Sequence, residues 1–159
     1  MSTSYSENST ARRVRVIADY QFGKSIGAEL FPDSCEFSFS TTGRIRQVLL
    51  GGIRLATVRA EDGRLTLSIE CAERLQKALP PPSYRVEVNA EVAEFVAAGK
   101  NAFAKHVIAA DPMIRSGDEV LVVSGEDTLL ATGTAMLSGA EMLVFNYGVA
   151  VKVRQGRSV

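Results

Sequence analysis

The chain has 159 residues, of which 46% are hydrophobic and 23% are charged, the usual proportions of a globular protein. Eighteen lysines and arginines balance eighteen aspartates and glutamates, so the formal net charge is zero. This length excludes a closed eight-stranded βα barrel within the chain, because such a barrel needs about 250 residues. The charge balance excludes a strong overall field, so any surface that attracts a polyanion or a membrane has to arise from local segregation of charge.

Two cysteines and one histidine limit the redox and metal chemistry of the chain. Cys35 and Cys71 are far apart and lack the short spacing of a metal-binding pair, so we expect two buried, reduced thiols, with a disulfide as the alternative. With His106 alone, we expect no metal site and no cofactor. No apolar run reaches the length of a membrane span, and residues 1–11 lack the apolar core of a signal peptide, so we expect a cytoplasmic protein without a membrane partner.

The first half of the chain predicts a small α+β domain. Residues 1–11 lack apolar periodicity, so we expect a loose tail, and the folded part starts with a period-two alternation at 12–16. Apolar residues at every fourth position predict a short helix over 22–30. Turn residues between alternating segments predict an antiparallel meander, with strands at 36–40, 44–50, 53–59 and 65–69 and then a helix over 69–79.

Three consecutive prolines, Pro80 to Pro82, mark the boundary between the two halves. Proline cannot continue a helix and favours an extended, semi-rigid spacer. We therefore expect two separately packed domains, over residues 12–79 and residues 83–157.

The second half predicts a small mixed β-barrel. Asn89 is a candidate N-cap for a short helix that Gly99 ends, because glycine takes the left-handed conformation without steric cost. Ser138 and Glu141 have the spacing of a capping box and predict a second helical turn. Short apolar or alternating segments predict strands at 84–88, 102–109, 120–123, 129–137 and 149–154.

The sequence contains no recognisable catalytic site. Neither a nucleophile elbow nor a glycine-rich phosphate loop is present, and His106 has no evident nucleophile partner. The carboxylates are scattered, so no pair for acid–base catalysis can be assigned. We therefore expect no catalytic residues and no enzyme that acts alone.

Two segments carry basic residues and no acidic residue, namely 99–106 and 151–159. If the last strand lies beside the loop that follows the first helix of this half, the two segments form one basic patch. The alternative is an ordinary solvated face. The basic residues concerned are Lys100, Lys105, Lys152, Arg154 and Arg157.

The loop at 99–105 is the more specific feature. Small residues leave backbone N–H groups accessible to phosphate oxygens, and lysines add charge. The alternative is a plain connector with solubilising lysines, and we expect Phe103 in the core rather than under a base. The candidate RNA-binding residues are Gly99, Lys100, Asn101, Ala102, Lys105, Lys152 and Arg154.

Residues 83–157 resemble the PUA domain, the RNA-binding module named for pseudouridine synthases and archaeosine transglycosylases. The order of the matching motifs is more specific than any one of them. The matching stretches are 92–96, 99–105, 110–112, 115–123, 130–133, 137–142 and 148–154.

The resemblance extends upstream. Residues 15–23, 42–46 and 55–59 resemble the domain that precedes PUA in archaeosine tRNA-guanine transglycosylases. The resemblance implies tRNA binding, with the PUA domain at the acceptor stem and 3′ end, while a separate catalytic barrel exchanges a base in the D-arm. Because this chain lacks the barrel, the resemblance implies either a stand-alone tRNA-binding protein or the non-catalytic subunit of a split transglycosylase.

We therefore predict an RNA-binding protein of class α+β, a small domain with an antiparallel meander followed by a PUA-like barrel. The alternative is a protein-interaction or assembly module in a ribosome or RNA-modification complex. The involvement of the first domain is open, since its arginines form either a basic face or an ordinary solvated sheet. These arginines are Arg44, Arg46, Arg54, Arg59 and Arg64.

Overall fold

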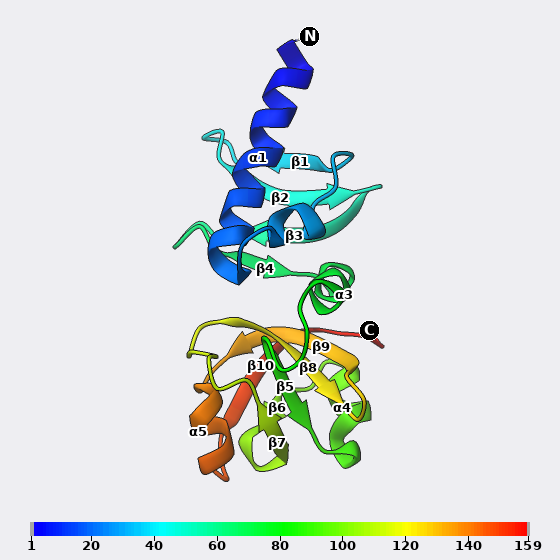
Figure 1. Ribbon diagram of the computed structural model, residues 1–159, viewed down its shortest axis with the longest axis vertical. Helices are drawn as coiled ribbons and strands as arrows, with labels where there is room; N and C mark the ends of the chain where they lie inside the picture. Colours follow the sequence, from blue (N-terminus) through cyan, green and yellow to red (C-terminus); the bar gives the residue numbers. More distant parts are fainter. Residues whose placement is uncertain (1, 159) are drawn as a thin grey trace. The chain divides into compact units, whose positions relative to one another are not determined.

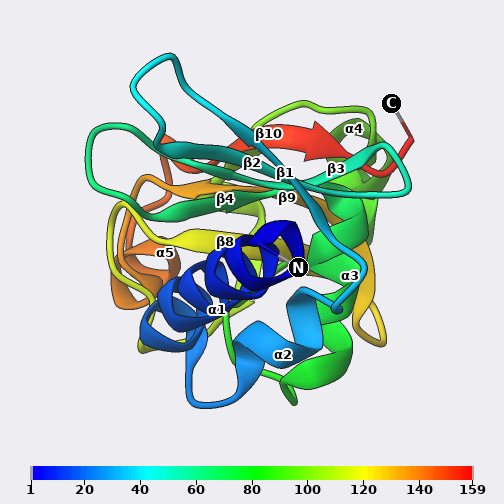
Figure 2. The ribbon, with the colours of Figure 1, turned by 90° about the horizontal axis from the view of Figure 1, so that it is seen from above.

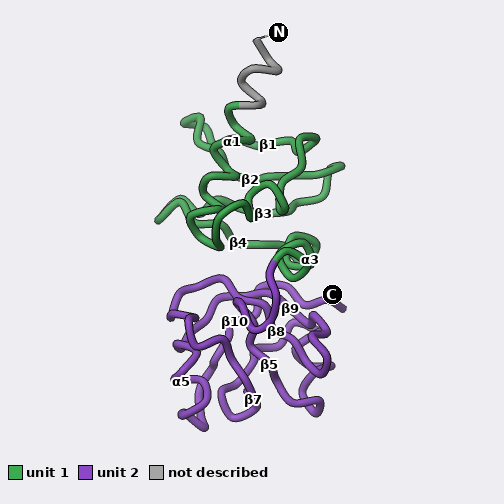
Figure 3. Tube along the Cα trace, in the orientation of Figure 1, with its two compact units in different colours: residues 1–78 green, residues 79–159 purple. Residues whose placement is uncertain are grey.

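The computed structural model describes residues 2–158, and the side chains of residues 9–158. The chain divides into two compact units, Met1–Ala78 and Leu79–Val159 (Figure 3). The three prolines at 80–82 lie among the first residues of the second unit. Whether each unit folds by itself stays a prediction.

The first unit is a four-stranded antiparallel sheet with its helices on one face (Figures 1 and 2). Its strands follow the chain in order, which confirms the predicted meander. They are β1 (Glu36–Phe39), β2 (Ile45–Leu50), β3 (Ile53–Val58) and β4 (Leu65–Leu67). The helices are α1 (Ser2–Phe22), α2 (Ile26–Leu30) and α3 (Ile69–Ala78).

The predicted N-terminal tail is wrong, because α1 already begins at Ser2. Met1 lies outside the described residues, but Thr10 and Ala11 are buried within the helix. The segment 12–16, whose alternation predicted an extended start, is part of this helix. The buried residues of the helix are spaced three or four positions apart, as on one helical face: Ala11, Val14, Ala18 and Phe22.

Close contact with α2 fixes the position of α1. A Cβ atom on Gly27 would lie 2.2 Å from the carbonyl oxygen of Arg15, so only glycine fits there. The Gly27 N–H donates to Asp19 Oδ1 at 2.6 Å, and the Arg15 guanidinium donates to the Phe31 carbonyl at 2.7 and 2.9 Å. In the same unit neither Cys35 nor Cys71 forms a disulfide, and both are buried, as predicted; burial raises the pKa of the Cys35 thiol.

The second unit is a six-stranded mixed sheet that curls into a nearly closed barrel, which confirms the predicted fold class (Figure 1). Its strand order is β6-β10-β9-β8-β5-β7, and β5 and β8 run parallel while the other pairs are antiparallel. The strands are β5 (Arg85–Val88), β6 (Ala102–Phe103), β7 (Val107–Ala110), β8 (Glu119–Ser124), β9 (Thr128–Ala135) and β10 (Val149–Gly156).

Short helices connect these strands. They are η1 (Ala90–Val92), α4 (Ala93–Ala97), η2 (Ala104–His106) and α5 (Gly139–Val144), so the predicted single strand at 102–109 is interrupted by a helical turn. Ser138 and Glu141 form the predicted capping box at the start of α5. Asn89 stands at the N-cap position of η1 but makes no side-chain cap bond.

The second unit has a core of its own. Valines from β5 and β8 pack with Met142 of α5 and Val96 of α4, all almost fully buried. The buried Arg85 guanidinium binds Asp127 through two hydrogen bonds of 3.1 Å, and both residues belong to this unit. No helix among residues 2–158 is long and apolar enough to span a membrane.

We predict that a fragment beginning at Ser83 folds without the first unit, because its core and its buried ion pair are complete within it. Circular dichroism and a thermal melt of the fragment should show cooperative unfolding, with the full chain as the control. An unfolded fragment would mean that the two units depend on a common core and that the boundary at the prolines is wrong.

Candidate nucleic-acid interface

The loop after α4 and strand β10 lie side by side, which is the condition that the sequence analysis set for a single basic patch. β6 pairs antiparallel with β10, with Phe103 opposite Val149 and Ala102 opposite Val151. Beyond the paired residues, the Val153 N–H donates to Asn101 Oδ1 at 3.0 Å. Two segments about 50 residues apart in sequence therefore form one surface.

Gly99 ends α4 as predicted, but the backbone around it is not free to bind phosphate. Gly99 has φ +103°, and its N–H donates to the Val96 carbonyl at 2.9 Å while the Lys100 N–H donates to the Phe95 carbonyl at 3.0 Å. This is the Schellman arrangement of a glycine C-cap. The Ala104 N–H likewise donates to the Gly148 carbonyl at 2.9 Å. The expectation of accessible amides is therefore wrong at positions 99, 100 and 104, and contacts to a ligand fall to side chains.

The end of β10 contacts the end of α4. A Cβ atom on Gly156 would lie 2.2 Å from the Ala97 carbonyl oxygen and 2.7 Å from the Gly99 nitrogen. The Ser158 N–H donates to the same Ala97 carbonyl at 2.8 Å. Only glycine at position 156 allows the strand to approach the helix end this closely.

Three of the predicted residues present unpaired charge. Lys100, Lys105 and Lys152 are exposed, and within residues 9–158 none of their side chains makes a hydrogen bond or an ion pair. We call these three side chains the lysine surface. Because their charges are not compensated locally, they remain available to a polyanion.

Arg154 differs from the lysines because a buried carboxylate holds it. Its two terminal nitrogens bind the carboxylate of Glu119, with Nη2 2.5 Å from Oε1, and Nη2 also lies 3.3 Å from Thr134 Oγ1. Glu119 is only 4% exposed, so it needs this partner. The charge of Arg154 is therefore largely neutralised within the domain.

The other predicted positions have mixed placements. Ala102 is 1% exposed and packs in the core, so its side chain cannot meet a ligand. Asn101 is exposed, but its side-chain oxygen is already bonded to β10. Phe103 is 43% exposed, so the prediction that it lies in the core is wrong. The small residues on either side of it, Ala102 and Ala104, take the buried positions, an alternation that is visible in the sequence.

The sequence analysis missed an exposed apolar segment. Residues 143–147 span the end of α5 and the start of the loop after it, and within them Leu143, Val144, Phe145 and Tyr147 are all exposed. The signal was a run of large apolar residues with a single polar interruption at Asn146.

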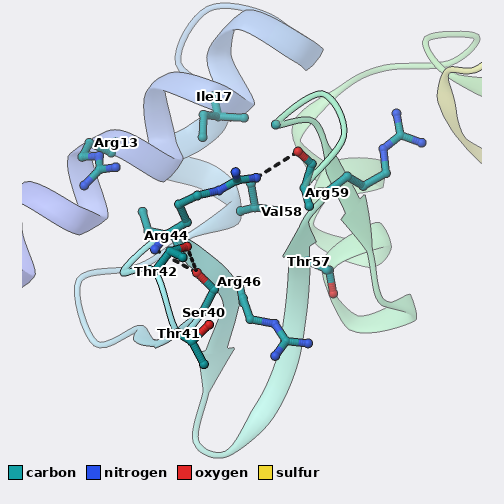
Figure 4. A pocket seen from close by; sticks show the side chains of 13 residues that line it. Arg13, Ile17, Ser40, Thr41, Thr42, Arg44, Arg46, Thr57, Val58 and Arg59 are labelled. Atoms are coloured by element: carbon teal, nitrogen blue, oxygen red, sulfur yellow. Dashed lines mark hydrogen bonds between the residues drawn. The ribbon is translucent and has the colours of Figure 1, made fainter.

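The first unit has a basic cavity of about 690 Å³ between α1 and the sheet (Figure 4). Two of its arginines have fixed partners: Arg59 binds the Asp62 carboxylate through two hydrogen bonds, and Arg44 donates to the Ala60 carbonyl at 2.9 Å. The Arg64 N–H also donates to Asp62 and holds the pKa of that carboxyl below its usual value. The other two, Arg13 and Arg46, are exposed and have no partner among residues 9–158.

Residues 84–157 match the family model of the PUA domain, so the second unit is a PUA domain and the chain is a PUA-domain protein. Residues 12–82 match the model described as patch-forming domain C2 of tRNA-guanine transglycosylase. The chain thus has the two domains that form the C-terminal region of the tRNA-guanine transglycosylases, as the resemblance of the motifs implied.

Relatives of known activity extend the match over both units. The tRNA-guanine(15) transglycosylase of Pyrococcus abyssi is 55% identical over 147 residues, which is 92% of this chain and 25% of that enzyme. The enzyme of the same name from Methanothermobacter thermautotrophicus is 48% identical over 91% of this chain and 22% of its own length. The chain therefore spans about a quarter of the length of these enzymes.

Solved structures agree on the fold. A hypothetical protein from Pyrococcus horikoshii superposes with a TM-score of 0.71 at 22% identity, over 92% of this chain and 89% of its own. A conserved PUA domain protein from Thermoplasma acidophilum superposes with a TM-score of 0.64 at 21% identity, over 94% of this chain and 89% of its own.

We predict that Gly156→Ala destabilises the protein by about 1–3 kcal/mol, because the added methyl group overlaps the end of α4. Chemical denaturation measures the loss, and amide NMR shifts should change most at residues 97–101. Gly117→Ala is the control: its Cβ would meet nothing within 4 Å, and only its φ of +94° is unfavourable. Equal, small effects of both substitutions with unmoved shifts at 97–101 would contradict the close contact.

Proposed function

We propose that this protein binds tRNA through its PUA domain and positions it for base exchange by a catalytic domain that residues 1–159 do not contain. The observation that carries the proposal is the lysine surface, where three uncompensated charges lie on segments joined by the β6–β10 pairing. The acceptor stem and the 3′ end are the proposed tRNA contacts, and the cytoplasm is the proposed location. The presence of a PUA domain and the relatives' activity support RNA binding and a role in tRNA modification.

The chemistry of the surface suits a backbone contact rather than base readout. The narrow major groove of an A-form stem hides its base edges, so a protein recognises its shape, its phosphates and its 2′-hydroxyls. Lysine ammonium groups meet phosphates as point charges and release counterions when they do. Asn101, tied to β10, holds the loop in place between them. The PUA domain therefore positions the tRNA, and the catalytic residues belong to the separate catalytic domain.

A second contact is proposed for the first unit. Arg13 and Arg46 present free guanidinium groups at the basic cavity, beside hydroxyl groups of Ser40, Thr41 and Thr42 (Figure 4). Guanidinium groups bind phosphate through two parallel hydrogen bonds. The full chain should accordingly bind tRNA more tightly than the fragment that begins at Ser83, and Arg46→Gln should remove part of the difference.

We expect Lys100→Ala, Lys105→Ala and Lys152→Ala each to weaken tRNA binding by about two- to fivefold at low salt, as exposed charge pairs do. Each substitution should also reduce the magnitude of the salt slope by about one, because one phosphate contact is lost. A titration over a range of salt concentrations, with intact tRNA and tRNA without its 3′ tail, measures both effects. Thermal melts should stay unchanged.

Lys24→Ala is the matched control, since Lys24 is an exposed lysine of the first unit. If the three substitutions behave like the control, the lysine surface is an ordinary solvated face. The assembly-module alternative then replaces tRNA binding, and it predicts no salt-dependent affinity for RNA.

We also expect no base exchange by the purified chain alone. No pair of catalytic groups can be assigned in the sequence, and the chain covers about a quarter of the relatives' length. Incorporation of labelled guanine into tRNA, assayed with and without a separate transglycosylase catalytic domain, tests this expectation. Exchange without the added domain would refute it.

A further inference from the structure

The second unit has a cavity of about 330 Å³ beside the last residues of β7. Its walls come from the neighbouring strands β8, β5 and β7 (Figure 1), from the turn between β8 and β9, and from two prolines before β5. We call this cavity the β7 pocket. Ligand pockets usually measure about 300–1,000 Å³, so this one has room for a single long side chain.

Strand register defines the floor of the β7 pocket. Glu87 of β5 lies opposite Ala109 of β7 and opposite Val123 of β8, so these three residues form one row across three strands. The neighbours of Glu87 in its strand, Val86 and Val88, are fully buried, so the row faces away from the core of the barrel. The Glu87 carboxylate therefore stands between two apolar side chains on the outside of the sheet.

Arg85 joins the two walls of the β7 pocket. Its guanidinium binds the Asp127 carboxylate through two hydrogen bonds of 3.1 Å, which holds the turn between β8 and β9. Its Nη1 donates to the Ser83 carbonyl at 3.0 Å, and its backbone N–H donates to the Pro82 carbonyl at 2.9 Å. The turn and the proline segment are therefore fixed to β5 before a ligand arrives, which lowers the entropic cost of binding.

The β7 pocket carries a net negative charge. Glu87, Glu126 and Asp127 supply three carboxylates and Arg85 supplies one guanidinium, so the net charge of the lining is minus two. Asp127 is paired with Arg85, whereas the carboxylates of Glu87 and Glu126 make no hydrogen bond or ion pair among residues 9–158. Such a pocket repels the phosphates of RNA and attracts a cation.

An arginine side chain matches both the apolar and the acidic parts of the β7 pocket. Its methylene groups and flat guanidinium pack on apolar surface such as Pro81, Pro82 and Ala110, and its N–H groups bind a carboxylate in pairs. A lysine ammonium is more strongly hydrated and meets a carboxylate as a point charge. Arginine is also enriched at protein interfaces, where lysine is depleted. The occupant that fits best is therefore an arginine on a protein surface.

The β7 pocket and the lysine surface use different parts of the barrel. Lys105 lies in η2, before β7 begins, whereas Ala109 and Ala110 are the last residues of β7. Lys152 lies on β10, and strands β9 and β8 separate β10 from β5. The two surfaces can therefore be occupied at the same time, one by RNA and the other by protein.

We propose that the β7 pocket binds an arginine side chain on the surface of the transglycosylase catalytic domain. The identity of this partner rests on the proposed function, which needs a catalytic domain that residues 1–159 do not contain. The pocket docks that domain on the PUA domain, while the lysine surface holds the tRNA.

The first experiment titrates the full chain with N-acetylargininamide and with N-acetylcitrullinamide, a neutral analogue of similar shape. In amide NMR spectra the arginine compound should shift residues 87, 109 and 125–127, and the citrulline compound should leave them in place. Glu87→Gln and Glu126→Gln should each weaken binding of the arginine compound by about two- to fivefold. Glu91→Gln is the matched control, because Glu91 is an exposed glutamate of η1 in the same unit.

Ala109→Leu tests the shape of the β7 pocket without changing its charge. Ala109 is exposed, so a larger side chain there fills part of the cavity. Binding of the arginine compound should fall by about fivefold or more, because the compound and the added side chain compete for the same space. Thermal melts and tRNA affinity should stay as in the wild type for all of these variants.

The second experiment measures the binding of the full chain to a separate transglycosylase catalytic domain by calorimetry. The double variant Glu87→Gln/Glu126→Gln should bind this domain about tenfold more weakly than the wild type does, because two ionic contacts are lost. Its affinity for tRNA should equal that of the wild type.

The outcomes separate this proposal from the proposed function. If the arginine compound shifts no residue of the β7 pocket, or if the variants bind it as Glu91→Gln does, the pocket is overturned and tRNA binding at the lysine surface stands. If the catalytic domain does not bind, or binds the double variant as tightly as the wild type, the docking is overturned. If the catalytic domain binds through the pocket but tRNA does not bind, the docking stands and the proposed function falls. Self-association that the double variant abolishes would make a second copy of this chain the occupant and overturn the proposal.

Discussion

The backbone contact at Gly156 fixes the relation between the two segments of the proposed interface. Without a side chain there, the end of β10 reaches the last turn of α4, and Ser158 bonds to the same carbonyl that Gly156 approaches. β10 in turn positions β6 by strand pairing and Asn101 by a side-chain bond. The loop with Lys100 is therefore held from both sides, by the helix that precedes it and by the strand beside it.

Charge in this domain serves two different purposes. Arg85 and Arg154 satisfy carboxylates inside the fold, because a buried Glu119 without a partner would cost several kcal/mol. The ammonium groups of Lys100, Lys105 and Lys152 have no hydrogen-bond or ion-pair partner among residues 9–158, and they face water. Arginine suits the first purpose because its planar group fits a carboxylate in two places, whereas a lysine ammonium suits transient contact with a phosphate. A count of basic residues therefore overstates the binding surface.

The parts of the fold that local patterns determine could be predicted from the sequence. Two-residue periodicity gave the meander of the first unit, and Gly99 and the Ser138–Glu141 spacing gave the ends of the short helices. The N-terminal helix was missed because its buried stripe starts in a polar segment, where Thr10 and Ala11 are covered only by tertiary packing. Local patterns could not show which strands lie next to one another in the sheet of the second unit.

The same limit applies to the candidate site. The sequence could indicate that two basic segments meet, but not that Glu119 neutralises Arg154, since these residues are 35 positions apart. It could not show that Lys100 uses its amide in a helix cap. Phe103 and Tyr147 were not recognised as surface residues, because large apolar residues are usually buried. For Phe103, the burial of Ala102 and Ala104 on either side shows that it faces outward.

The pairing of β6 with β10 has a consequence for how the protein is made. Residues 102–103 emerge from the ribosome well before their partners at 149–151, and the central strands β8 and β9 are synthesised in between. Closing a loop of this length is slow compared with forming a hairpin, since its entropy must be lost before the contacts compensate. During synthesis the β8–β9 hairpin can form first, while the edge of β9 that later receives β10 stays open. The proposed RNA-binding surface is thus the last part of the domain to be assembled, and we expect a nascent chain to engage RNA there only after the final strand is in place.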